Sequence, residues 1–277
     1  KPIRMLFISS GLESLMVTPR FHIDLGESSS FTFVEHHVGE STSFFQNESV
    51  FITLGQNAQL DHIRIQSNSP STVNMANLHV KQERNSTYSF FQYADGGKLG
   101  RLNIHVDLEG EGADCSLNGL ALSNDHQHID NHIITDHLVP HCTSSQNFKT
   151  VLQDKSSGVF NGRTIVRKDA QKTDSSQSNK NLLLSENALM NSNPQLEIYA
   201  DDVKCAHGSS TGALNQDALF YLRSRGLDIL SAKALMVRGF ATELLDRVNH
   251  ESIREFITQR FDQWLTENTT SDNSLSR

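Results

Sequence analysis

One pattern constrains the fold of this chain more than any other. Between residues 20 and 204, short runs of alternating apolar and polar residues recur, and each ends in a polar break that contains glycine. A period of two is that of a β-strand with one buried face. The clearest runs are Phe21–Leu25, Val50–Leu54 and Leu102–Leu108. After the breaks at 26–30, 55–58 and 109–113, further strands are expected to begin at Phe31, Leu60 and Cys115. The unit of strand, glycine turn and strand thus repeats about three times.

No long helical pattern separates these strands before residue 212, which argues against a parallel sheet built from βαβ units. Two all-β architectures remain, a sandwich and a solenoid of stacked coils. The polar segment Ser175–Asn181, between Val159–Val166 and Leu182–Leu184, is typical of a coil wall. On pattern alone, the solenoid is only slightly favoured over the sandwich.

The periodicity changes after Gly212. A short helix is expected over Asp217–Arg225, ended by Gly226 in the position after the C-cap. Two further helices are marked by apolar residues at helical spacing. Their apolar faces are Val237, Phe240, Ala241, Leu244, Leu245 and Val248, and Ile253, Phe256, Ile257, Phe261 and Trp264. We therefore expect a β core over residues 1–212, a small C-terminal α-helical domain over 213–265 and a polar, disordered tail over 266–277.

Composition narrows the class of function. A net charge of −8 argues against nucleic acid as a partner, because phosphate neutralisation needs a basic face. No run approaches the ~20 apolar residues of a membrane-spanning helix, and the interrupted apolar stretch at 1–17 predicts no signal peptide. Cys115, Cys142 and Cys205 are too scattered for a disulfide framework, so reduced thiols and a cytoplasmic location are expected. The chain begins without Met and in mid-pattern, as a fragment would.

Several segments in a fixed order resemble the SufB/SufD family, the scaffold proteins of the Suf iron–sulfur cluster assembly machinery, with the SufD pattern as the nearer match. The family's N-terminal helical region is absent from this chain, and the first hundred residues fit more loosely. The matching segments are Gln127–His132 with Asp136 and His137, Pro140–Ser144, Val159–Gly162, Ala170–Asp174, Gln177–Ser185 and Glu197–Gly226.

The resemblance decides the fold and implies a role. SufB and SufD cores are right-handed β-helices, so a mainly β, right-handed β-helix (solenoid) core is expected here. The implied role is that of a non-catalytic scaffold subunit that pairs with a SufB-like subunit through the β-helix and binds a SufC-like ABC ATPase through the helical domain. Open strand edges at the ends of such a core would also allow a homodimer of the isolated chain. A SufB-like primary cluster scaffold is the alternative within the family.

The pair Cys205 and His207 is the first candidate site. Residues i and i+2 of a strand share a face, so the thiol and imidazole could both reach an iron atom. Two ligands are not four, so a cluster here would need ligands from another chain. The alternative without a ligand role is a buried thiol beside a hydrogen-bonded structural histidine. The resemblance implies that His207 faces SufB at a transient Fe–S cluster, aided by Cys205, with no cofactor bound stably by this chain alone.

A second candidate is a histidine-rich segment. Its alternating residues would share one strand face and could suit Zn, Fe or Cu, yet three such positions span ~13 Å. An outward polar ladder that hydrogen-bonds between coils is the favoured interpretation. The segment comprises His126, His128, Asp130, His132, Asp136, His137, His141 and Cys142.

A third candidate belongs to a different class. The run Gly208–Gly212 matches G-x-S-x-G and is expected between a strand and a helix, as the nucleophile elbow of a serine hydrolase using Ser210 would be. The only downstream histidine that could serve it is His250. Without alternating strands and helices upstream, a turn that caps the following helix is the favoured interpretation.

Overall fold

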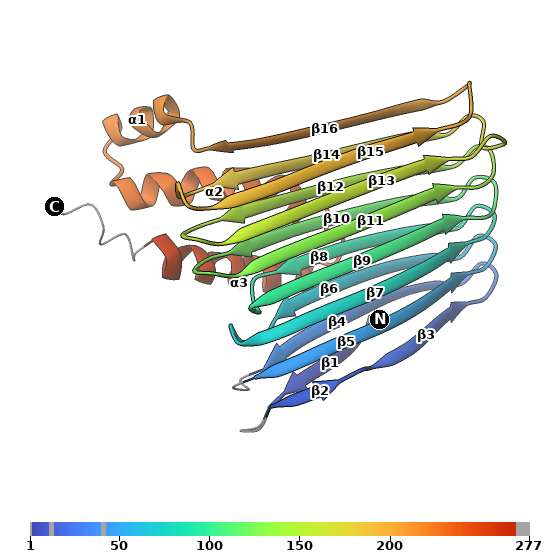
Figure 1. Ribbon diagram of the computed structural model, residues 1–277, viewed down its shortest axis with the longest axis horizontal. Coiled ribbons are helices and arrows are strands. Elements are labelled where there is room, and N and C mark those ends of the chain that lie inside the picture. Colours follow the sequence, from blue (N-terminus) through green and yellow to red (C-terminus); the bar gives the residue numbers. More distant parts are fainter. Residues whose placement is uncertain (1, 11–13, 40–42, 270–277) are drawn as a thin grey trace.

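The protein is described by a computed structural model that covers residues 2–10, 14–39 and 43–269. Two parallel sheets face each other, and the chain alternates between them as it winds, so the fold is a β-solenoid (Figure 1). Sheet A contains, in spatial order, β1 (Ile3–Ser9), β4 (Ser30–Gly39), β6 (Gln59–Ser67), β8 (Thr87–Ala94), β10 (Asp114–Ser123), β12 (Thr143–Leu152), β14 (Asp174–Leu183) and β16 (Lys204–Ala213). Sheet B contains β15 (Leu189–Ile198), β13 (Ser157–Val166), β11 (His128–His137), β9 (Leu99–Leu108), β7 (Thr72–Gln82), β5 (Phe44–Leu54) and β2 (Leu15–Val17), and β3 (Arg20–Leu25) also pairs with β5. The expected solenoid core is confirmed, and the sandwich is excluded.

Left-handed turn residues recur once per coil in most of the solenoid. In six of the turns where the described chain passes from sheet B to sheet A, one residue has a positive φ, and hydrogen bonds link successive turns along the solenoid. The backbone N–H of Asn57, for example, donates to the carbonyl of Arg84, one residue before the next such position. Asn, Asp, His and Gly tolerate this conformation best. The stacked positions are Ser28, Asn57, Asn85, Gly112, His141 and Lys172.

Three of these turns are predicted by the sequence, and the other three are not. The breaks that contain Ser28, Asn57 and Gly112 lie where expected, and the strands that follow them begin within one residue of the expected positions. Asn85, His141 and Lys172 occupy equivalent turns without a nearby glycine signal. The repeated unit therefore occurs more often, and at more regular intervals, than the glycines of the sequence indicate.

Alternate side chains of each strand fill the space between the sheets. In the middle coils the filling is apolar, with Ile52, Leu78, Ile104 and Phe90 among the fully buried residues. Towards both ends it becomes polar, and four inward side chains of β14 are Ser175, Gln177, Asn179 and Asn181. A protein with only 36% hydrophobic residues can form this core because many buried positions are hydrogen-bonded polar groups.

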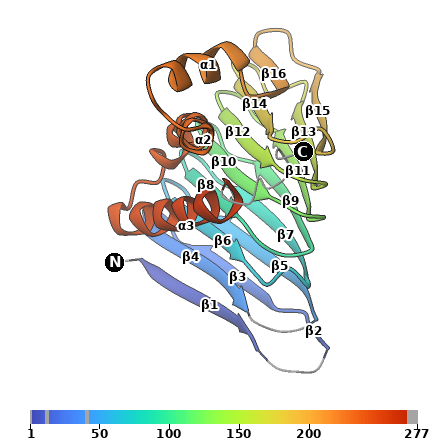
Figure 2. The ribbon, with the colours of Figure 1, turned by 90° about the vertical axis from the view of Figure 1, so that its left-hand side faces the viewer.

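Three helices follow the strands: α1 (Gln216–Ser224), α2 (Ile229–Leu245) and α3 (Glu251–Thr269). Asn215 and Asp228 cap the first two, and Gly226 has the positive φ expected after α1. Figure 2 shows α2 and α3 lying against the outer face of sheet A. Their apolar residues form one buried cluster with that face, which joins Val237, Phe261 and Trp264 to sheet residues such as Ile63 and Leu120.

The disordered tail expected over 266–277 is wrong for residues 266–269. Helix α3 continues to Thr269, and the Asn268 side chain accepts a hydrogen bond from Asn124 at 2.6 Å. Asn268 is buried against the solenoid, which explains why the helix extends this far. Residues 270–277 lie outside the described part of the chain. Among the helices described, none is long and apolar enough to cross a membrane.

Candidate terminal-coil site

Cys205 and His207 lie on β16, the last strand of sheet A, where the stack of coils ends (Figure 1). β16 pairs in register with β14, which places Cys205 beside Ser175 and His207 beside Gln177. Because β16 is a strand over both residues, their i, i+2 spacing places the thiol and the imidazole on the same strand face. Their side of the strand is the one from which β14 points Ser175 and Gln177 into the core.

The two side chains differ in exposure. His207 is exposed, whereas Cys205 is half-buried and packs against the small cluster of Val166, Ala170 and Ala200. Burial, together with the nearby Asp174 carboxylate, raises the pKa of the Cys205 thiol. A thiol with a raised pKa is a poorer nucleophile and needs a metal or another positive charge to become a thiolate ligand.

Polar side chains line the same end of the solenoid interior. The Ser192 hydroxyl on β15 lies 2.7 Å from that of Ser209 on β16, and it donates to Asn179 at 2.7 Å. Asn181 donates to the Thr211 hydroxyl at 3.2 Å. The last coil therefore closes the interior with hydroxyl and amide groups rather than with an apolar plug.

β15 and β16 are the outermost strands of the two sheets at this end, so each leaves one backbone edge without a strand partner among the described residues. Such edges readily pair with strands of another chain. Exposed apolar side chains, Leu189, Ile198 and Tyr199, lie along and just after β15. Together with Cys205 and His207, these residues define what we term the terminal-coil face.

The histidine-rich segment is structural. His128 lies 2.7 Å from the Ser157 hydroxyl of the next coil, and Asp130 pairs with His132 at 2.8 Å and with Arg101 at 3.0 Å. Its donor atoms do not meet at a single point among the described residues. The outward polar ladder is thus confirmed for these three members of β11.

Other members of that segment take different positions. His126 is in the turn before β11 and does not share its strand face, so that expectation was wrong. His141 is one of the stacked left-handed turn residues. His137 points inward and bonds the Ser144 hydroxyl at 2.8 Å, Asp136 pairs with Arg167 at 2.6 Å, and Cys142 is fully buried.

The turn favoured for Gly208–Gly212 was wrong, because this run forms part of the extended strand β16, and Asn215 caps the helix in place of the Ser and Thr of the run. The alternative, a serine hydrolase, also lacks its geometry, because an extended strand gives Ser210 no nucleophile elbow. His250 lies 2.8 Å from the Thr32 hydroxyl on β4, at the opposite end of sheet A from β16. The chain cannot bring this histidine to Ser210.

Sequence reasoning missed a buried cluster of charged residues between β4, β5 and β6. Glu35 lies 2.9 Å from His62, and Arg64 contacts both Glu35 at 3.3 Å and Glu48 at 3.2 Å. Although burial opposes it, His62, His37 and Arg64 hold the pKa of Glu35 well below its usual range. Burial and the charge of Glu35 raise the pKa of Glu48. Alternation of charged residues with apolar ones resembled a solvent-facing strand, which hid this cluster.

Comparison with known families agrees with the fold. Residues 7–240 match the family described as "SUF system FeS cluster assembly, SufBD core domain". The chain therefore belongs to the SufB/SufD family. The match also includes most of the first hundred residues, where the resemblance had looked loose.

Individual relatives place the chain on the SufD side of that family. The iron–sulfur cluster assembly protein SufD of Escherichia coli is 33% identical over 269 residues, which cover 96% of this chain and 64% of that protein. A SufBD family protein of Synechocystis is 33% identical over 93% of this chain and 59% of its own length. The chloroplastic protein ABCI7 of Arabidopsis thaliana is 33% identical over 86% of this chain and 50% of its own length. The chain thus spans between half and just under two thirds of these relatives.

Proposed function

We propose that this chain acts as a SufD-like, non-catalytic scaffold subunit in iron–sulfur cluster assembly, and that it pairs with a SufB-like subunit through the terminal-coil face. The observation that carries the proposal is the position of His207, exposed beside Cys205 on the terminal strand of the solenoid. In this arrangement the cluster is cargo held between two chains. His207 supplies an imidazole ligand from this side, and the partner supplies the remaining ligands.

The terminal-coil face has the properties that an interface with a second solenoid requires. Two parallel sheet edges can continue into the sheets of a second solenoid by backbone hydrogen bonds. Leu189, Ile198 and Tyr199 add apolar area beside those edges. The raised pKa of Cys205 suits a thiol that stays protonated until iron arrives.

A second contact is proposed for the helices. Phe220 and Tyr221 on α1 and Leu235 on α2 are large apolar side chains that remain exposed after the helices have packed on sheet A. Exposed apolar residues grouped on a small helical unit are characteristic of protein-binding surfaces. We assign this surface to a SufC-like ATPase, whose ATP-driven motion would then reach the terminal-coil face through α1 and β16.

The test is co-expression of this chain with SufB-like and SufC-like proteins, followed by measurement of complex formation and of growth in a strain that depends on the Suf system under iron limitation. We expect His207→Ala to leave the complex intact and abolish growth, with Cys205→Ala giving a weaker loss. His126→Ala, in an exposed turn, is the matched control. Growth of the His207→Ala strain at the control rate would refute the role of His207.

The two proposed interfaces are tested separately. Tyr199→Asp should release the SufB-like protein while retaining the SufC-like one, and Phe220→Asp should do the reverse. A chain that binds neither partner in its native form would refute the subunit assignment itself.

A further inference from the structure

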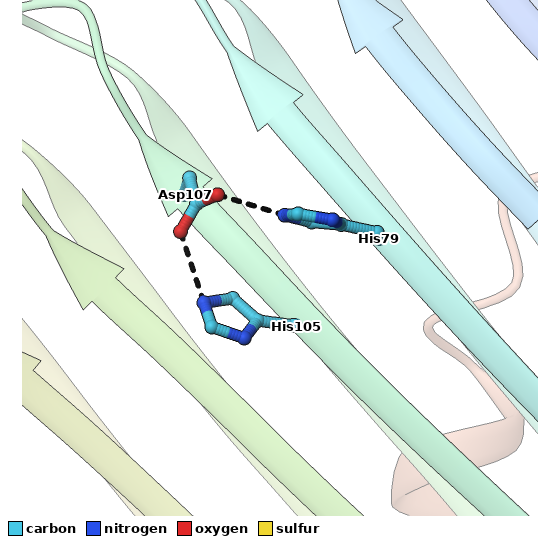
Figure 3. Close-up of side chains that lie close together, drawn as sticks. All are labelled: His79, His105 and Asp107. Atoms are coloured by element: carbon cyan, nitrogen blue, oxygen red, sulfur yellow. Dashed lines mark hydrogen bonds and ion pairs between the residues drawn. The ribbon is translucent and has the colours of Figure 1, made fainter.

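The outer face of sheet B carries a compact set of metal-type side chains far along the solenoid from the terminal coil. His79 on β7 and His105 on β9 are register partners in adjacent parallel strands, and Asp107 follows two residues after His105 on the same face. Figure 3 shows both imidazole rings directed at the single carboxylate between them. The Nε2 atom of His79 lies 2.8 Å from one oxygen of Asp107, and the Nε2 atom of His105 lies 2.9 Å from the other.

The solenoid itself produces this convergence. Register partners in neighbouring strands stand roughly 5 Å apart, and residues i and i+2 of one strand roughly 7 Å apart. Three side chains at such corners can direct their outer atoms at a common point. The donor atoms of His79, His105 and Asp107 all lie within 4.8 Å of one another.

The donor set selects the chemistry. Two imidazole nitrogens and one carboxylate oxygen suit a divalent transition metal such as Zn²⁺, Fe²⁺, Co²⁺ or Ni²⁺, whereas Ca²⁺ and Mg²⁺ prefer oxygen ligands. Three protein ligands leave coordination positions open for water. The side chains of His79 and His105 are 40% and 43% exposed, so an ion can enter from solvent, while Asp107 is held more firmly at 17%.

Neighbouring charges leave this carboxylate available. Lys81 is the register partner of Asp107 and interacts with it electrostatically, but its ammonium makes its direct ion pair with Glu109 at 2.7 Å. With neutral imidazoles, the group formed by Asp107, Lys81 and Glu109 carries one net negative charge. The buried cluster of Glu35, His37 and Glu48 also has metal-type ligands within reach of one another, but Arg64 already supplies a cation to both of its carboxylates. The outer set lacks such an internal cation among the described residues.

We propose that His79, His105 and Asp107 form a binding site for a divalent transition metal ion on the outer wall of the solenoid. Without metal, each imidazole donates its Nε2 proton to Asp107. When metal binds, each ring carries its proton on Nδ1 and presents the Nε2 lone pair to the ion. The exposed rings can adjust to the shorter ligand distances that metal imposes. The site is independent of the terminal-coil face and of the function proposed for it.

The experiment is calorimetric titration of the metal-stripped full chain with Zn²⁺. All proteins carry Cys205→Ala and His207→Ala, so that the terminal coil contributes no ligand. We expect one equivalent to bind, and we expect His79→Ala and His105→Ala each to weaken it by at least about tenfold, since even loss of residues that only orient a ligand costs 10–100-fold. His128→Ala on the neighbouring strand, with its bond to Ser157, is the matched control and should bind as the parent does.

Melting curves separate a ligand role from a structural one. If the three residues bind metal, Zn²⁺ raises the melting temperature of the parent and of the His128→Ala control, but not that of the His79→Ala/His105→Ala double variant. If they only hydrogen-bond to each other, the double variant melts earlier without metal and Zn²⁺ shifts none of the proteins. That second result, or unchanged Zn²⁺ affinity in the double variant, would overturn the proposal.

Discussion

Replacing Arg64 by Met tests the physical account of the buried charged cluster. Arg64 is among the largest fully buried side chains of the protein, and its guanidinium lies between two carboxylates that have no access to water. Met fills a similar volume without the charge, so the variant removes the interaction with little loss of packing. Glu35 and Glu48 would then be left as neighbouring acids inside the core, with only His37 and His62 to offset them.

The expected loss of stability is large. Removing one partner of a buried ion pair leaves an uncompensated charge and costs about 3–5 kcal/mol. For a chain of this size, about 1 kcal/mol corresponds to a melting-temperature shift of roughly 2–4 °C, so the Arg64→Met variant should melt roughly 6–20 °C lower. By contrast, Arg163→Met removes a half-exposed pair with Glu197 on the outer wall and should cost no more than about 1 kcal/mol.

The loss should also depend on pH. The pKa of Glu48 is raised in the native state, so its contribution to stability is present below its ordinary pKa and is lost as pH rises through the raised value. The pKa of Glu35 is lowered, partly by Arg64, so its contribution is present above its ordinary pKa. Without Arg64, the pKa of Glu48 rises further and the pKa of Glu35 rises back towards its ordinary value. Both changes destabilise the fold most at neutral pH. The difference between variant and parent should therefore shrink as pH falls towards the ordinary Glu value of about 4.5.

The assay is thermal and urea unfolding, followed by circular dichroism and by the fluorescence of Trp264, the only tryptophan. Adding Glu48→Gln to Arg64→Met should recover part of the loss, because it removes one of the two stranded acids. The reasoning fails if Arg64→Met lowers the melting temperature no more than Arg163→Met does, or if its effect is the same at pH 5 and pH 7.

Three further predictions concern the turns, the thiols and an inward histidine. Gly112→Ala should cost about 1–2 kcal/mol in urea unfolding, because its φ is +74° and a Cβ would meet the Asn85 side chain at 2.3 Å; the same change at the open, ordinary Gly239 of α2 should not destabilise. Iodoacetamide should label Cys205 alone in the native protein, with the other two cysteines reacting only after unfolding, as peptide mass spectrometry can show. Burial lowers the pKa of His137 to about 4, so the stability that depends on its neutral form is present above its ordinary value of 6.5 and is lost as pH falls towards 4; His137→Gln should flatten the unfolding curve in that window.

The sequence predicted the elements better than their arrangement. Alternation at Leu102–Leu108 and the glycine that follows α1 are local signals, and both elements appear where expected. The register between coils is not local: strands a whole coil apart pair with each other, and the stacked turns that join them include Asn85 and Lys172, whose positive φ no glycine indicates. Only a comparison between coils reveals that these positions are equivalent.

The candidate site followed the same division. The i, i+2 spacing of Cys205 and His207 was readable from the chain, but their place on the terminal strand required the order of the sheet. His79 and His105 are separated by a whole coil, so neither draws attention in sequence, and register alone makes them neighbours. In the same way, the sequence matches G-x-S-x-G, but the structure around the match is not that of a nucleophile elbow, because strand β16 continues through it.

In a solenoid, the hydrogen-bonding groups of each coil are paired with those of the next coil. The last coil has no such neighbour, so it presents unpaired groups that the middle of the stack does not. Within the stack, His137 bonds Ser144, Ser144 bonds Ser175, and each strand has a neighbour on both sides. β16 is the last member of sheet A, and beyond it no strand of the described chain covers Cys205, His207 or the backbone edge that carries them. An apolar cap would be the simple way to end such a stack, yet the exposed residues of β16 are Lys, His, Ser, Thr, Gly and Ala, with no large apolar side chain among them. A strand end without large apolar side chains is stable in water, and its free edge can gain further hydrogen bonds when a second chain extends the sheet. The proposed cluster site between two subunits requires both properties.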